Sequence, residues 1–130
     1  MADSSKYLKP GAGQRKMNNF LAKVGAPAVA IPGRKSGTLR IAAIIPVTVG
    51  GKKYLVSTRG NSDWALNLRV AARGELRRGW SRQQFTAIEV AGAERERVVA
   101  AYRRRYGIEV NQYFEQLPDL ADHPTFRLEF

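Results

Sequence analysis

A basic stretch bounded by glycines, Gly33–Arg40, has the residue types of an anion-binding loop. Two apolar runs flank it, which predicts two strands joined by a tight connection. Glycine permits a sharp turn that leaves backbone N–H groups free to face an anion. Arg34 and Arg40 can each bind a phosphate through two parallel hydrogen bonds, and Lys35 adds a compact positive charge. The stretch therefore predicts a loop that binds the anionic part of a ligand.

Two better-known motifs with similar residues are absent. The phosphate loop of nucleotide hydrolases needs a lysine directly after its second glycine, whereas Thr38 follows Gly37 here. Penicillin-binding proteins combine a Lys-Thr-Gly strand with a Ser-x-x-Lys nucleophile, and no serine of this chain has a lysine three positions on. A solvent-exposed hairpin that is merely basic stays open as the alternative.

Length and composition predict a single basic domain. The chain has 130 residues and a formal net charge of +11, from 22 Lys plus Arg against 11 Asp plus Glu. Such a charge attracts polyanions, among them nucleic acid, anionic lipid and multiply charged cofactors. The absence of cysteine fits a reducing, cytoplasmic compartment. We expect a flexible tail over residues 1–14 and one domain over residues 15–130.

Turn signals and apolar periodicity predict about six strands and two or three helices in a mostly antiparallel sheet or barrel, a mainly β fold of the α+β class. The Gly50-Gly51 pair predicts a hairpin turn, and Gly74 is expected to end a helix that Asn61 or Ser62 caps. Strands are expected at Ala28–Ile31, Ile41–Ile45, Val47–Val49, Tyr54–Ser57, Glu75–Trp80, Phe85–Val90 and Thr125–Phe130. Helices are expected at Arg15–Val24, Asp63–Arg73, Ala93–Tyr106 and, more briefly, Asn111–Gln116.

The first of these helices, Arg15–Val24, carries an apolar stripe with three readings. In the first interpretation the stripe packs against the core, in the second it contacts a membrane surface, and in the third it covers a ligand. A peripheral membrane contact through this N-terminal segment is therefore left open.

Three segments of the chain resemble the deazaflavin-dependent nitroreductase family of actinobacteria. They are Gly33–Gly37 with Arg40, Ser57–Gly60, and the run from Trp64 to Gly79. The resemblance implies a split β-barrel like that of the pyridoxamine phosphate oxidases. It also implies that reduced deazaflavin coenzyme F-420 donates a hydride to a small electrophile, such as a quinone or a nitroaromatic compound. Flavin mononucleotide is the less favoured cofactor.

The resemblance also implies roles for individual residues. Because the coenzyme carries a phosphate and an oligoglutamate tail, the basic loop would bind both. Thr58, Arg59 and Gly60 would lie along the ring system or its linker, and Trp64 would border the cofactor cleft. No catalytic side chain is assigned, since a hydride carrier supplies the chemistry itself. The loop residues in this cofactor-binding set are Arg34, Lys35, Ser36 and Arg40.

Other candidate residues have plainer interpretations. The single histidine, His123, has no second histidine or cysteine as a metal partner, so a surface or structural role is expected and no metal site. Asp119 and Asp122 are expected in a solvated turn. Trp64 is either a core anchor or part of the cleft. Core or rim positions are expected for Tyr54, Trp80 and Phe85, and the arginines at 77, 78 and 103–105 either extend a cationic channel or are surface charge.

Two other functions remain as alternatives. The high positive charge suits a nucleic-acid-binding module, although the aromatic residues do not alternate with the basic runs, so nucleic acid is not the expected partner. A split barrel that binds another ligand without turnover, such as a flavin nucleotide, haem or fatty acid, is the third reading. A homodimer is left open.

Overall fold

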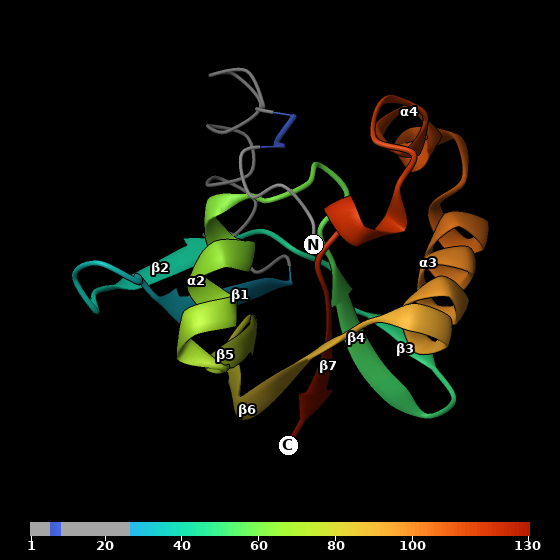
Figure 1. Cartoon of the computed structure of the whole chain (residues 1–130). Helices are drawn as coiled ribbons and strands as arrows, with labels where there is room; N and C mark the ends of the chain where they lie inside the picture. The colour runs from blue at the N-terminus through green and yellow to red at the C-terminus, as the bar shows by residue number, and fades with distance from the viewer. Residues whose placement is uncertain (1–5, 9–26) are drawn as a thin grey trace.

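A computed structural model describes residues 6–8 and 27–130 of the chain. Seven strands form one antiparallel sheet with the order β2-β1-β5-β6-β7-β4-β3, curled into a split β-barrel (Figure 1). Helix α2 covers one side of the sheet, whereas α3 lies beside β3 and β4, and α4 follows α3 farther from these strands (Figure 1). The strands are β1 Ala28–Pro32, β2 Leu39–Ala42, β3 Val47–Val49, β4 Lys52–Val56, β5 Arg73–Arg78, β6 Ser81–Val90 and β7 Thr125–Glu129. The helices are α2 Asp63–Ala71, α3 Gly92–Tyr106, α4 Ile108–Gln116 and the short 3-10 helix η1 Leu120–Asp122.

The mainly antiparallel α+β fold predicted from the sequence is confirmed. The predicted helix Arg15–Val24 lies outside the described residues, and so do most residues of the predicted tail. Within the described residues, no helix is both long enough and apolar enough to cross a bilayer.

Strand β4 shows how the sheet separates two apolar clusters. Leu55 points into the barrel, where it packs in the cluster that contains Phe126 and Leu68 of α2. Tyr54 and Val56 point the other way, into a second cluster beneath α3 and α4. Both faces of this strand are therefore buried, which fits its continuous apolar run. Side chains of β4 thus pack toward α2 on one face of the sheet and toward α3 and α4 on the other.

The end of α2 differs from the prediction. Ala72, and not Gly74, closes the helix in a left-handed conformation with φ of 55°, and its N–H donates to the Leu68 carbonyl. Gly74 belongs to β5, where a Cβ would lie 2.7 Å from Phe85 Cζ and 2.9 Å from the Ala30 carbonyl oxygen. The glycine is there because the Phe85 ring occupies the space of a side chain.

Replacing Gly74 with alanine is expected to lower the free energy of unfolding by about 1–3 kcal/mol, the usual cost of overpacking a core. Urea denaturation measures this loss. Phe85→Leu shortens the opposing side chain, so the double variant Gly74→Ala/Phe85→Leu should lose less stability than the sum of the two single variants. Wild-type stability in Gly74→Ala would contradict the packing described here.

Two further expectations about the strands are wrong in detail. The second strand ends at Ala42, because the apolar residues after it leave the sheet and line a cavity. Trp80 is neither core nor rim: it is 98% exposed at the tip of the β5–β6 hairpin. Tyr54 and Phe85, by contrast, are buried in the core as predicted.

Candidate active-site cleft

Two neighbouring cavities open at one rim of the barrel. The first, the loop cavity, has a volume of about 550 Å³ and is lined by Gly33–Ser36, Arg40 and Asn67. The second, the tyrosine cavity, has a volume of about 570 Å³ and is lined by Thr58, Arg59, Tyr102 and Tyr106. The cavities share the walls Tyr7, Ile41, Ala42, Ser62 and Trp64, so they form one cleft with a cationic end and an aromatic end.

The β1–β2 connection builds the cationic end. Gly33 N donates to the Thr38 carbonyl at 2.9 Å, and Gly37 N donates to the Gly33 carbonyl at 2.9 Å. Gly37 has a φ of 76°, which glycine adopts without strain. The backbone N–H groups of Lys35 and Ser36, between these bonds, have no acceptor within the described residues. The turn thus presents free N–H donors beside three cationic side chains, as an anion site requires.

Asn67 of α2 orients Arg34. Its Oδ1 accepts hydrogen bonds from Arg34 Nη1 at 2.8 Å and from the Arg34 backbone N at 3.0 Å. Asp63 Oδ1 lies 3.4 Å from the other guanidinium nitrogen, Nη2. Asn67 is buried, and sequence reasoning assigned it no role, although an amide inside an amphipathic helix is a signal for such a contact.

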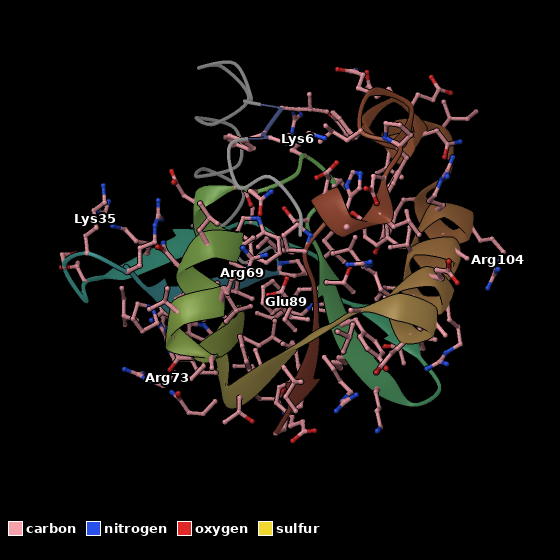
Figure 2. All side chains as sticks on the ribbon, in the orientation of Figure 1. Lys6, Lys35, Arg69, Arg73, Glu89 and Arg104 are labelled. Atoms are coloured by element: carbon pink, nitrogen blue, oxygen red, sulfur yellow. The ribbon has the colours of Figure 1, made fainter. Side chains whose placement is uncertain are left out.

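Charge in the loop cavity is mostly positive. Arg34, Lys35 and Arg40 all line it, and Asp63 is the one carboxylate among the described residues that line it. The Asp63 side chain is 87% exposed, so solvent weakens its pairing with Arg34. Lys35 extends from the outer end of the β1–β2 loop (Figure 2). The three predicted cations therefore come together around one cavity.

Trp64 has both roles that its sequence position left open. Its ring packs on Phe126 of the core, with centroids 6.1 Å apart. It also lines both cavities at the point where they meet. The indole is thus a wall of the cleft held by the core.

The turn after β4 contributes Thr58 and Arg59 to the tyrosine cavity. Arg59 Nη2 donates to the Tyr113 hydroxyl at 2.6 Å, and its guanidinium carbon lies 4.4 Å from the centroid of the Tyr113 ring. Its Nη1 donates to the Leu8 carbonyl at 3.2 Å. Arg59 therefore links the turn after β4 to Leu8 and to Tyr113 of α4.

Gly60, also predicted to bind the cofactor, is not among the residues that line either cavity. It is buried with a φ of 95°, and a Cβ would overlap the Lys6 carbonyl oxygen. Segment Lys6–Leu8 lies across this turn: Asn61 N donates to the Lys6 carbonyl at 2.8 Å, and Leu8 N donates to the Arg59 carbonyl at 2.6 Å. The close approach requires glycine and places Tyr7 in the wall shared by the cavities.

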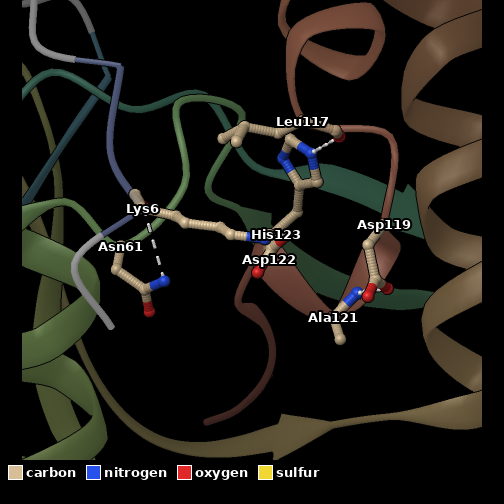
Figure 3. Close-up of polar contacts among 7 residues, drawn as sticks. All are labelled: Lys6, Asn61, Leu117, Asp119, Ala121, Asp122 and His123. Carbon is tan, nitrogen blue, oxygen red and sulfur yellow. Dashed lines mark hydrogen bonds and ion pairs between the residues drawn. The ribbon is translucent and has the colours of Figure 1, made fainter. Parts of the chain in front are cut away.

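Lys6 also forms an ion pair across the barrel rim. Its Nζ lies 3.2 Å from Asp122 Oδ2. Figure 3 shows the Lys6 side chain extending toward Asp122. Asp122 is buried, so the expectation of a solvated turn is wrong for this residue. Asp119 is exposed, as expected, and its side chain accepts a hydrogen bond from the backbone N of Ala121 (Figure 3). The buried carboxylate needs its lysine partner, which lies more than a hundred positions earlier in the sequence.

His123 contacts the turn after β4 through the carbonyl of Ser57. It is fully buried, with Nδ1 at 3.1 Å from the Ser57 carbonyl oxygen and Nε2 at 2.6 Å from the Leu117 carbonyl oxygen. Its ring stacks on Phe114 with centroids 4.3 Å apart. Of the two roles expected for this residue, the structural one fits and the surface one is wrong. Within the described residues, no group of histidine, cysteine or acidic side chains is arranged to bind a metal ion.

Tyr102 is the half-buried hydroxyl of the aromatic end. Burial raises the pKa of Tyr102 to about 12, and the neighbouring Tyr106, Tyr113 and Glu109 add to the shift. Its ring packs against Tyr106 with centroids 4.7 Å apart. The Tyr102 hydroxyl is therefore protonated at neutral pH and has a proton to donate.

Comparison with protein families decides what kind of protein this is. Residues 16–116 match the family model described as F420H(2)-dependent quinone reductase. The chain belongs to this family. Its cofactor is accordingly the reduced deazaflavin F-420, and it is an oxidoreductase with a small-molecule acceptor. A comparison with curated proteins finds no match.

Solved structures support the fold. The chain is 24% identical to an F420-H2 dependent reductase (FDR-A), covering 79% of this chain and 92% of that one, with a TM-score of 0.64. A structure described as a domain-swapped dimer gives 21% identity, coverage of 93% and 100%, and a TM-score of 0.64. HutZ, the haem storage protein of Vibrio cholerae, gives 14% identity, coverage of 89% and 88%, and a TM-score of 0.63. At these identities the similarity concerns the split barrel.

The loop cavity suits the anionic part of this cofactor. A phosphate and carboxylates need several cationic donors and free N–H groups, and the β1–β2 loop offers both. The broad aromatic end would then be left for the ring system and the acceptor.

Proposed function

We propose that the chain transfers a hydride from F-420 bound along this cleft to a quinone-like or nitroaromatic electrophile. The observation that carries the proposal is the junction of the two cavities at Trp64, with cations on one side and hydroxyl and aromatic groups on the other. The bound coenzyme supplies the hydride; the protein binds it, orients it and shapes the space for the acceptor.

The residues divide between the two ends. Arg34, Lys35 and Arg40 bind the phosphate and the tail, with Ser36 contributing its hydroxyl and backbone N–H. Thr58 and Arg59 line the region of the ring system, and Trp64 limits how far the ring enters. Gly60 acts indirectly, by allowing segment Lys6–Leu8 to lie against the turn.

The acceptor lies in the tyrosine cavity. A quinone or nitro group gains negative charge on oxygen as it receives a hydride, and a fixed hydroxyl donor stabilises that charge. Tyr102 is such a donor. A flat aromatic acceptor also suits the Tyr102–Tyr106 pair, whose rings form part of the wall.

Anaerobic mixing with reduced F-420 and menadione, or with a nitrobenzene derivative, tests the proposal. Saturable, acceptor-dependent return of the absorbance of the oxidised deazaflavin is the expected result, and the faster acceptor defines the class. Binding of the coenzyme without oxidation by either acceptor would reject both proposed acceptor classes.

Replacing Tyr102 with phenylalanine is expected to lower kcat by about 100-fold, because the acceptor oxygen loses its hydrogen-bond donor. The Kd of the coenzyme should not change. Since the pKa of Tyr102 is about 12, wild-type activity should show no titration of this group below about pH 11. Tyr54→Phe is the matched control, because that hydroxyl bonds Glu94 outside the cleft. A kcat equal to wild type in Tyr102→Phe would remove the assigned role.

Haem binding without turnover is less well supported by this site. The one histidine of the chain is fully buried, and both ring nitrogens face backbone carbonyls. It is therefore not placed to coordinate iron in the cleft.

A homodimer stays a proposal, and sedimentation velocity with and without F-420 tests it.

A further inference from the structure

A third cavity lies at the other end of the barrel interior. Its volume is about 320 Å³. Residues of β3 and β4 line one side, and residues of β5 and β6 line the other, although β6 and β7 separate β4 from β5 in the sheet. We call it the barrel-end cavity. Its polar lining side chains are Thr48, Lys53, Arg78, Ser81 and Gln83.

Strand register places these side chains on the sheet face that encloses the core. Lys53 pairs with both Thr48 and Leu128, so the three side chains share one face of the sheet. Leu128 is buried in the barrel core, so Lys53 continues the same face beyond it. On β5, Arg78 lies two residues after the core residue Leu76 and so shares its face. Lys53 and Arg78 are exposed, so they lie at the solvent-facing mouth of the cavity, whereas Leu76 is buried.

The two cations at the cavity mouth, Lys53 and Arg78, lack the carboxylate partners that neighbouring cations have. Arg77 and Arg82 pair with Glu75, and Arg127 pairs with Glu94. Within the described residues, neither Lys53 nor Arg78 has an ion pair, and no carboxylate lines the barrel-end cavity. The Lys53 ammonium lies over the Phe130 ring, with Nζ 5.9 Å from the ring centroid. Two unpaired cations, two hydroxyls and one amide around a cavity are the donor set of an anion site.

The remaining wall is apolar. Ile45, Pro46 and Leu76 line the cavity beside the polar groups. A volume of about 320 Å³ is within the lower range of small-molecule sites and exceeds the size of a bare phosphate ion. The occupant therefore carries an apolar body next to its charged group.

We propose that the barrel-end cavity binds a small amphipathic organic anion. Its phosphate or carboxylate group contacts Lys53 and Arg78, and its apolar body lies on Ile45, Pro46 and Leu76. Ile45 also lines the tyrosine cavity, so an occupant of the barrel-end cavity would contact a residue that the two cavities share. The site is separate from the Gly33–Arg40 loop and does not depend on the proposed hydride transfer.

Titration with hexyl phosphate tests this, read by calorimetry and by backbone amide shifts in NMR spectra. We expect saturable binding with shifts at Thr48, Lys53, Arg78 and Ser81. Hexanoate reports whether carboxylate serves as well as phosphate. Inorganic phosphate and hexanol, which lack one half of the chemistry each, should bind more weakly.

Charge variants separate a site from general attraction. Lys53→Gln/Arg78→Gln should weaken hexyl phosphate binding about tenfold or more, since both charge-assisted contacts are lost. The control Lys52→Gln/Arg73→Gln removes the same charge from two residues that are likewise exposed but do not line the cavity, and it should bind as wild type does. Equal weakening in both variants, shifts confined to residues 33–40, or no saturable binding would each overturn the proposal.

Discussion

The variant Arg34→Ala/Lys35→Ala should bind F-420 about 100-fold more weakly than wild type. Each charge-assisted hydrogen bond to a phosphate or carboxylate contributes about 1.5–3 kcal/mol, and partial exposure to solvent reduces the sum. Arg34 is the more important of the two, because Asn67 already holds its guanidinium in place. A fluorescence titration with the oxidised coenzyme measures the Kd without requiring turnover.

The matched control for this double variant is Lys52→Ala/Arg104→Ala. Both side chains are exposed, on β4 and α3, and neither lines the loop cavity. The control removes the same net charge, so it reveals any loss due only to long-range attraction. Tight binding in Arg34→Ala/Lys35→Ala would mean that the loop is a basic hairpin without a role in the cofactor site.

The second large effect is expected for His123→Ala, which should lower the free energy of unfolding by about 3–5 kcal/mol. The change leaves a cavity next to Phe114 and removes the hydrogen bond that the imidazole donates to a buried carbonyl of Ser57 or Leu117. Chemical denaturation followed by circular dichroism measures the loss. His123→Phe keeps the stacked ring and should recover part of it.

Loss of His123 should also reach the cleft. The Ser57 carbonyl that faces the imidazole begins the turn that carries Thr58 and Arg59. A variant that folds, such as His123→Phe, is therefore expected to bind the ring end of the coenzyme less well while the phosphate end is unaffected. Wild-type stability in His123→Ala would show that the ring only fills space.

Local sequence signals predicted much of the fold. The Gly50-Gly51 turn has φ values of 58° and 77°, as a tight hairpin between β3 and β4 requires. Helix α3 ends at Gly107, with acidic residues early and arginines late, as its sequence indicated. These features depend on residues close together in the chain, and their backbone preferences can be read directly.

Contacts between distant segments could not be predicted in the same way. Asp122 resembles a turn residue until Lys6 is placed beside it. Gly74 resembles a helix stop until the Phe85 ring, from another strand, occupies the position of its Cβ. For the site, residue types in Gly33–Arg40 indicated anion binding, but only the fold brings the loop next to Asn67 and Tyr102's cavity.

Segment Lys6–Leu8 has a consequence for how this protein can diversify. Tyr7 forms part of the partition between the two cavities, yet the segment adds only one isolated bridge, Tyr7 to Gly60, to the sheet. Substitutions at Tyr7 are therefore expected to reshape the boundary between the two cavities while the pairing of the seven strands is kept. With the acceptor in the tyrosine cavity, as proposed, this one position can change which acceptor fits without a change of fold.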